Sequence, residues 1–322
     1  VYQCTWESGE DGNPRLDPTG SGDAVIAGRV RPVELQATVA HAAGVLAFLA
    51  GELGQDGERW RQVEAEYRRR TQQLFDPVEG HYRDWLITEG GPQPACPDRP
   101  YWEVDACRYS AQSLTPLLLG PGIPEAEVWR HARPPWTLWP SWTWSLVESA
   151  AAAGLYAGVG GLAFETIDRV YRVTTRRGLG HLARPLPGTS PEFWPQDWET
   201  FAGSDAYGWG ATTANLLIRH LFGFKESRST DGWVANLTPA FPPALRRAGA
   251  RYAVRQMSYR GLRFDLGFVV TADGIQAELD LLDDARTCMV DRGGERVYAS
   301  SGAERRHVFP VELAGAVSLR LA

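Results

Sequence analysis

LRFDLGFVVTADGIQAELDLL, residues 262–282, contains two runs in which apolar and polar side chains alternate. Alternation with a period of two is typical of a β-strand that buries one face, and the intervening TADG resembles a hairpin turn. Three further short runs share this texture: YAVRQMSY (252–259), RTCMVDR (286–292) and RHVFPVEL (306–313), with a DRGG turn at 291–294. The sequence therefore predicts a small C-terminal β-sandwich over residues 250–322.

Upstream of residue 225 the periodicity is helical. Residues 33–53 carry apolar side chains every three or four positions, and residues 58–74 repeat the pattern after a Gly-Gln-Asp-Gly break, which predicts two helices joined as an αα-hairpin. The apolar stripe of the first helix consists of Leu35, Val39, Ala42, Leu46, Leu49 and Leu53. Further helices are expected at 109–119, 124–132, 143–154, 160–176 and 208–222.

The predicted fold class is therefore mainly α. Hairpins stacked in a ring form an (α/α)6-type toroid, and we expect such a toroid over residues 1–224, a linker over 225–249, and the β module after it. About seven helices are counted, fewer than the twelve of a six-hairpin ring, so the toroid is expected to be incomplete unless part of it lies upstream.

Composition narrows the function classes. The chain has 322 residues, of which 43% are apolar and 22% charged, and a net charge of −6 offers no basic face for nucleic acid or for a membrane surface. The sequence shows no evident membrane-spanning run and no signal peptide, so we expect a cytoplasmic protein. The six histidines and four cysteines lack metal-ligand spacing, and neither a metal nor another cofactor is expected. Cys96 and Cys107 flank a proline-rich stretch, and whether they pair is left open.

Thirteen tryptophans are the unusual feature, because several stand beside proline in loops. Flat aromatic rings in loops suit the stacking of sugar rings, although tryptophan also fills protein cores. Three loop segments combine such rings with carboxylates or prolines. They are CTWESGEDGNPRLD (4–17), HARPPWTLWPSWTWSLV (131–147) and SPEFWPQDWETFAGSDAYGWGATTANLLI (190–218).

Together the three segments resemble the trehalase, processing α-glucosidase and mannosylglycerate hydrolase group of inverting glycoside hydrolases. WESGEDGNPRLD is similar to the acid-bearing loop of that group, WPSWTW to its Trp-Pro segment, and PEFWPQDWETFAGSDAYGW to the segment that carries the general base. LFDPVEGHYRDW and VELQATVAHAAGVLAFLA also match hairpin segments, so the resemblance spans roughly residues 4–245. It implies an (α/α)6 barrel and a carbohydrate substrate.

The resemblance also implies roles for particular residues. Asp11 matches the general acid and Glu192 the general base, with Glu199 as the alternative base. Inverting hydrolysis of an α-linked glucoside or mannoside needs such a pair, one carboxyl group to protonate the leaving oxygen and one to activate water. Sugar contacts are expected from Trp6, Glu7, Gly9, Arg15, Trp139, Trp144, Trp194 and Trp209, although each tryptophan can equally belong to the core.

Three residues depart from the pattern of the group. Glu10 and Leu16 replace an apolar residue and a tryptophan beside the acid, and Thr143 stands where asparagine is common. These departures keep a second hypothesis open, in which the chain is a non-catalytic carbohydrate-binding or structural remnant of such a glycosidase. The sequence does not decide the sugar, the linkage or the oligomeric state.

Overall fold

The computed structural model describes residues 30–78, 80–89, 91–94, 111–120, 122–131, 140–175, 192, 208–227, 229 and 232–322. These residues fall into two compact units. The first takes its members from 1–155 and 170–212, and the second from 156–169 and 213–322.

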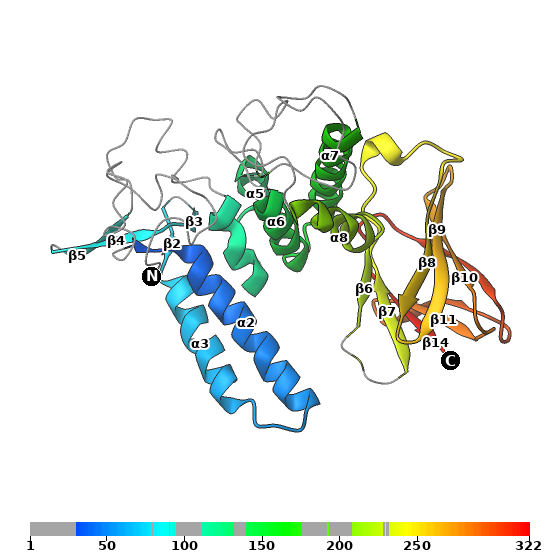
Figure 1. Cartoon of the computed structure of the whole chain (residues 1–322), viewed down its shortest axis with the longest axis horizontal. Helices are drawn as coiled ribbons and strands as arrows, with labels where there is room; N and C mark the ends of the chain where they lie inside the picture. Colours follow the sequence, from blue (N-terminus) through cyan, green and yellow to red (C-terminus); the bar gives the residue numbers. More distant parts are fainter. Residues whose placement is uncertain are drawn as a thin grey trace. The chain divides into compact units, whose positions relative to one another are not determined.

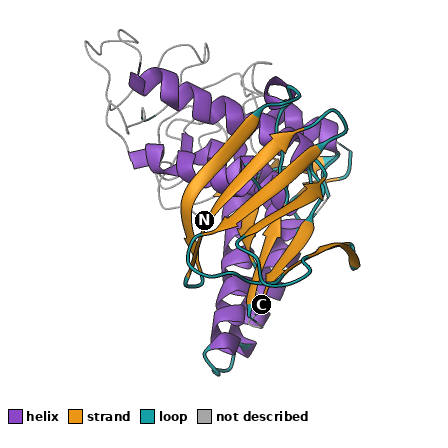
Figure 2. Cartoon of the chain, turned by 90° about the vertical axis from the view of Figure 1, so that its right-hand side faces the viewer, coloured by secondary structure: helices purple, strands orange, loops and turns teal. Residues whose placement is uncertain are grey.

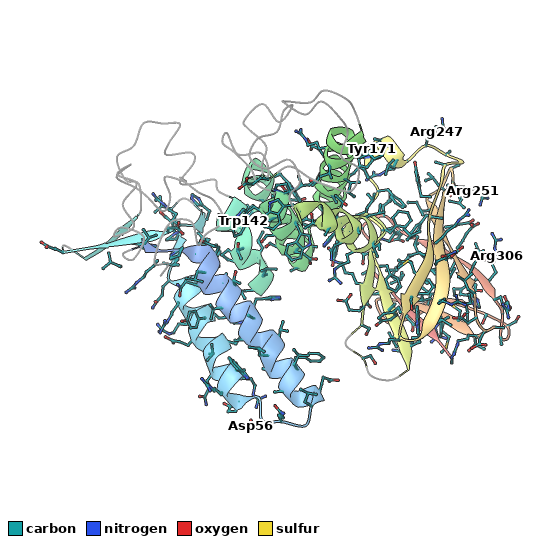
Figure 3. The ribbon with its side chains drawn as sticks, viewed as in Figure 1. Asp56, Trp142, Tyr171, Arg247, Arg251 and Arg306 are labelled. Carbon is teal, nitrogen blue, oxygen red and sulfur yellow. The ribbon has the colours of Figure 1, made fainter. Side chains whose placement is uncertain are left out.

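The first unit contains the predicted αα-hairpin. Helices α2 (Val33–Glu52) and α3 (Glu58–Gln72) lie side by side in Figure 1, and their bounds agree with the sequence prediction to within two residues. Both starts are stabilised by aspartate: the N–H of Val33 donates to Asp84 Oδ1 at 2.8 Å, and the N–H of Glu58 donates to Asp56 Oδ1 at 2.8 Å. Asp56 is labelled at the turn of the hairpin in Figure 3.

The buried face of α2 is not the predicted leucine stripe. Ala37 and Ala40 are fully buried, whereas Leu46, Leu49 and Leu53 are 38%, 46% and 72% exposed. The helix is apolar around much of its circumference, so two faces compete, and the alanine face is the one that packs on α3 and the helix η2. Small side chains allow a closer approach of helix axes than leucines would.

Helix α2 is also long and apolar enough, by length and composition alone, to cross a membrane. The expectation of no spanning run is corrected on this point, because the many alanines of the helix keep its mean hydropathy at 1.5 without forming a run of large apolar side chains. Of its most apolar window, 44% is buried within the structure, as expected for a helix packed against protein.

Small elements complete the described part of the first unit. Strands β1 (Val30–Arg31), β4 (Trp85–Thr88) and β5 (Gly91–Pro94) form one antiparallel sheet, and β2 (Phe75–Asp76) pairs with β3 (His81–Tyr82). The 3₁₀-helix η2 (Ala111–Leu119) and the helices α5 (Glu125–His131) and α6 (Pro140–Ala152) follow. Residues 109–119, predicted as a helix, are thus 3₁₀-helical over 111–119.

The second unit begins with a helix and continues as two sheets. Helix α7 (Tyr156–Thr175) contributes its first fourteen residues, and the predicted helix at 208–222 is built from η3 (Gly208–Ala211), α8 (Thr212–Asn215) and the π-helix η4 (Leu216–Leu221), with the units dividing after Thr212. α7 approaches the chain beyond β7 so closely that a Cβ at Gly160 would stand 1.5 Å from the carbonyl oxygen of Ala240. Glycine is therefore required at this helix position.

The nine strands that the structure describes in the second unit are all antiparallel to their neighbours. One sheet has the order β12-β11-β14-β7-β6 and the other the order β13-β10-β9-β8, and Figure 2 shows both as orange arrows. The strands are β6 (Phe224–Glu226), β7 (Trp233–Leu237), β8 (Arg251–Tyr259), β9 (Leu262–Val270), β10 (Ile275–Leu281), β11 (Cys288–Arg292), β12 (Glu295–Ala299), β13 (Arg306–Val311) and β14 (Val317–Leu321). The antiparallel strands predicted after residue 250 are present, as are the TADG turn between β9 and β10 and the Gly-Gly turn between β11 and β12.

The core lies between the two sheets. Every second residue of β9 and β10 is buried there, and Phe264, Phe268 and Leu279 are at most 1% exposed. Trp233 of β7 joins this core, where its indole N–H donates to the carbonyl of Tyr259 at 2.9 Å. The alternation read from residues 262–282 thus fixes which side chains face the opposite sheet.

Two predictions are corrected by these elements. Residues 225–249, predicted as a linker, contain most of β6 and all of β7, and β7 is a sheet member because it pairs with β14 over Trp233–Leu237. The fold class is also corrected, because the described residues combine helices with several antiparallel sheets and are not mainly α. A closed (α/α)6 ring is not shown by the helices that the structure describes.

Candidate functional site

Most of the residues predicted to form a glycosidase site lie outside the described residues. This holds for the proposed acid, for the alternative base and for most of the sugar contacts, namely Asp11, Glu199, Trp6, Glu7, Gly9, Arg15, Trp139 and Trp194. Their assignments stay predictions from the sequence.

Three predicted site residues are described, all within the first unit. Trp144 lies in α6, Trp209 in η3, and Glu192, the proposed base, at a bend; each is half-buried. None of these three residues lines either of the cavities described below. The structure therefore locates them individually and does not assemble the predicted acid–base pair.

A cavity of the first unit lies where α2 begins and α3 ends. It has a volume of about 600 Å³, and we call it the hairpin cavity. Its lining combines three arginines with two apolar side chains, one glutamate and two glutamines: Arg31, Arg69, Arg70, Leu74, Trp85, Glu66, Gln36 and Gln73. Leu74 and Trp85 stand at the two ends of LFDPVEGHYRDW (74–85), which the sequence analysis matched to a hairpin segment of the glycosidase group.

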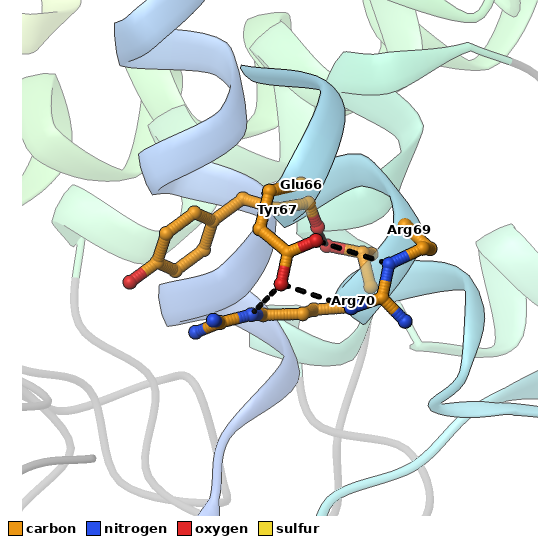
Figure 4. Close-up of polar contacts among 5 residues, drawn as sticks. Glu66, Tyr67, Arg69 and Arg70 are labelled. Atoms are coloured by element: carbon orange, nitrogen blue, oxygen red, sulfur yellow. Dashed lines mark hydrogen bonds and ion pairs between the residues drawn. The ribbon is translucent and has the colours of Figure 1, made fainter. Parts of the chain in front are cut away.

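Glu66 is the one carboxylate of the hairpin cavity. It accepts hydrogen bonds from Arg70 Nε at 2.8 Å and from Arg69 Nη2 and Nε at 2.9 and 3.0 Å (Figure 4). These hydrogen bonds lower the pKa of Glu66, and the one from Arg70 has the largest effect. The hydrogen bond to Glu66 in turn raises the pKa of Arg70. The guanidinium of Arg70 also lies 4.8 Å from the ring centroid of Tyr67.

This arrangement is unsuited to proton transfer. A general acid must hold its proton near the working pH, whereas the arginines keep Glu66 ionised. Pairs spaced three and four residues apart are common on exposed helix faces, and all three side chains are more than a third exposed. Arg68, Arg69 and Arg70, each more than a third exposed, thus belong to a solvated face of α3.

Metal chemistry has no candidate in the described part of the chain. No group of three or more His, Cys, Asp or Glu side chains there could hold a metal ion. The one described cysteine, Cys288, is buried in β11, where burial raises its pKa to about 12. A thiol with that pKa is protonated at neutral pH and is a poor nucleophile. Cys96 and Cys107 lie outside the described residues.

A second cavity, over the outer face of the five-stranded sheet, was not expected from the sequence. It is lined by residues of β6, β7, β11 and β14. Three of these strands, β6, β7 and β14, carry no strand prediction, so no sequence signal placed their outward side chains in one row.

Comparison with known proteins gives distant structural likenesses only. No protein-family profile matches the chain, and no curated protein matches its sequence. Among solved structures, it is similar to the GH63 mannosylglycerate hydrolase from Thermus thermophilus in complex with glucose, with a TM-score of 0.43 and 16% identity, covering 64% of this chain and 52% of that one.

Two further structures give comparable values. The same hydrolase in complex with Tris and D-glycerate has a TM-score of 0.43 at 16% identity over 62% of this chain and 49% of that one. An uncharacterized conserved protein from Thermus thermophilus has a TM-score of 0.43 at 16% identity over 59% and 47%. The chain thus spans about half the length of the structures it matches.

Proposed function

We propose that this chain is an inverting glycoside hydrolase acting on an α-linked glucoside or mannoside. The observation that carries the proposal is the acid-bearing loop WESGEDGNPRLD at residues 6–17, accompanied downstream by the carboxylate-aromatic segment PEFWPQDWETFAGSDAYGW at 191–209. These segments combine the two things that glycoside hydrolysis needs, paired carboxylates and flat rings that pack against sugar C–H faces.

In the proposed mechanism Asp11 is the general acid and Glu192 the general base. Asp11 protonates the glycosidic oxygen as the bond to the anomeric carbon breaks. Glu192, or in its place Glu199, removes a proton from the water that attacks the opposite face of the sugar, which inverts the anomeric configuration. Such pairs are separated by about 6.5–9.5 Å to leave room for the water.

Substrate contacts follow from the same resemblance. Trp6, Trp139, Trp144, Trp194 and Trp209 are proposed to pack against sugar rings. Glu7 and Arg15 are proposed to hydrogen-bond hydroxyl groups, and Gly9 to let the backbone come close to the substrate. Truncating a stacking ring removes binding in the ground state and transition state alike, so it should raise KM more than it lowers kcat.

The proposal is tested with the full chain on aryl α-glucosides, aryl α-mannosides and α-linked disaccharides. We expect hydrolysis of at least one of them, with the β-anomer appearing first by NMR. Asp11→Asn should lower kcat/KM for a substrate with a poor leaving group by about 100-fold or more, the low end of the effect of a general acid. Glu10→Gln, one position away with no proposed role, is the matched control and should stay near wild type.

Two outcomes contradict the assignment. An unchanged rate in Asp11→Asn removes Asp11 as the acid, and first release of the α-anomer removes inversion. The departures at Glu10 and Leu16 favour one alternative, a non-catalytic carbohydrate-binding protein. That alternative is supported if wild-type protein binds glucose or mannose but hydrolyses none of the substrates.

A further inference from the structure

A cavity of about 560 Å³ lies over the outer face of the five-stranded sheet, entirely within the second unit. We call it the sheet-face cavity. Its floor is formed by Lys225, Asn236, Ser318 and Asp291, with Tyr156 of α7 and the turn glycines Gly293 and Gly294 at its margin. It is independent of every residue assigned to hydrolysis.

The four floor residues form one row across four strands. Lys225 pairs directly with Asn236, Asn236 with Ser318, and Ser318 with Asp291. Directly paired residues project from the same face of a sheet, and neighbouring strands are about 4.8 Å apart. An ammonium, an amide, a hydroxyl and a carboxylate therefore stand side by side at regular spacing.

The alternation of each strand shows that this row faces away from the core. Each of the four residues has at least one chain neighbour in the buried core between the sheets, namely Phe224, Ala235, Leu237, Val317, Leu319 or Val290. Successive side chains of a strand point to opposite faces. The outer face of this sheet is thus polar at its centre, and the cavity lies over that polar centre.

Both ends of the row are held in place. The carboxylate of Asp291 accepts a hydrogen bond from Arg296 Nε of β12, and the ammonium of Lys225 lies 4.9 Å from the ring centroid of Tyr156. Burial raises the pKa of Tyr156, so its phenol stays protonated and can donate a hydrogen bond. Pre-set side chains lose less entropy when a ligand binds.

The middle of the row retains its hydrogen-bonding capacity. Asn236 and Ser318 are both half-buried, and neither side chain hydrogen-bonds to any residue that the structure describes. An amide offers two donors and an acceptor oxygen, and a hydroxyl is donor and acceptor at once. These groups can therefore bind a partner whose own groups both donate and accept.

The chemistry of the row selects among ligands. An inorganic anion would meet Lys225 and Arg320 but also the acceptor-only carboxylate of Asp291, and it would leave that carboxylate without a donor from the ligand. An apolar ligand would strip water from charged groups without replacing their hydrogen bonds. Sugar hydroxyls donate to Asp291, exchange hydrogen bonds with Asn236 and Ser318, and leave C–H groups to contact the Tyr156 ring. We infer that the sheet-face cavity is a saccharide-binding site, separate from the proposed hydrolytic site.

The test measures binding of glucose and of mannose to the full chain, by saturation-transfer NMR and calorimetry, with inorganic phosphate as a third probe. Wild type should bind at least one of the sugars. Asn236→Leu should weaken that binding tenfold or more, and Ser318→Ala several-fold. Ser258→Ala is the matched control, because Ser258 is an exposed strand residue of β8, in the other sheet; it should bind as wild type does.

Folding is checked in each variant by circular dichroism and thermal melting, and Ser318→Ala keeps the test decisive if Asn236→Leu does not fold. Unchanged sugar affinity in both cavity variants overturns the inference, as does binding of phosphate but neither sugar. Hydrolysis is assayed in parallel. Loss of sugar binding in Asn236→Leu with normal hydrolysis supports the site whether or not Asp11 is the acid, so the two proposals fail separately.

Discussion

The β-sandwich and the α2–α3 hairpin bury different kinds of side chain. The sandwich core is filled by large residues such as Phe264, Phe268 and Phe309, none more than 1% exposed, whereas the hairpin buries Ala37 and Ala40 and leaves leucines at the surface. Packed sheets stand about 10 Å apart and need long side chains to fill the gap. Helices that meet through alanine approach closely and bury less apolar area per residue, so the sandwich should tolerate truncation least.

The largest expected effect is therefore a cavity in the sandwich. Phe264→Ala should lower the free energy of unfolding by about 3–5 kcal/mol, because the ring packs against Phe224 and Trp233 and cannot be replaced by water. Leu49→Ala, on the exposed face of α2, should change it by less than about 0.5 kcal/mol. Urea unfolding measures both. A loss of more than about 2 kcal/mol for Leu49→Ala would break the comparison, since a loss of that size is typical of a buried leucine and would show that the leucine face is covered in solution.

The next largest loss of folding stability is expected at Gly223, where two backbone segments come close together. Gly223 has φ +76°, and a Cβ there would stand 2.0 Å from the carbonyl oxygen of Thr238. Gly223→Ala combines left-handed strain with overpacking and should cost about 2–4 kcal/mol. Gly261→Ala is the matched control, because Gly261 has φ +75° and open space around its Cβ, so only the strain of about 1 kcal/mol should remain. If the two variants lost the same free energy of unfolding, the backbone at Thr238 would be shown to move away from the new Cβ at no cost.

The strands of the sandwich were easier to predict from the sequence than the buried face of α2. β8, β9, β10, β11 and β13 were read from alternation or short apolar runs, because a strand has only two faces and one of them meets the core. β7 was missed because four of its five residues are buried, so WVANL does not alternate in exposure. The ends of α2 were predictable from Pro32 and the glycine-containing turn, but the choice between its two apolar faces depends on which neighbours pack against it.

The two proposed sites also differ in how far the sequence alone predicts them. The acid-bearing loop is contiguous in the sequence, so its resemblance to a glycosidase loop could be read directly, although Asp11 lies outside the described residues. The sheet-face row joins Lys225, Asn236, Asp291 and Ser318, which are brought together only by the register of four strands. No local pattern marks such a row before the strand pairing is known.

A larger side chain on the buried alanine face of α2 should lower the free energy of unfolding moderately. Ala40→Leu adds three carbons to a position with no exposed surface against α3 and η2, and overpacking of this kind costs about 1–3 kcal/mol. Ala42→Leu is the matched control, because Ala42 is exposed on the same helix. Far-UV circular dichroism during urea unfolding measures both. If Ala42→Leu were the more damaging change, the predicted leucine stripe would be the packed face after all.

The smallest expected effect is a pH dependence that belongs to the sandwich and not to the hairpin. His307 of β13 is fully buried, and burial lowers its pKa below the ordinary 6.5, partly offset by the nearby Glu304. Its Nδ1 lies 3.3 Å from the hydroxyl of Tyr298. As the pH falls below about 6.5 the unfolded chain binds a proton that the folded sandwich resists, so stability present at higher pH is lost on acidification.

Thermal melting between about pH 7.5 and 5, a range that spans the ordinary pKa of histidine, measures this loss. His307→Gln removes the titrating imidazole and should flatten the decline in melting temperature on acidification, even if it lowers the temperature at every pH. A decline in His307→Gln as steep as that of wild type would contradict the prediction, because only a group whose pKa differs between the folded and unfolded chain couples proton binding to folding.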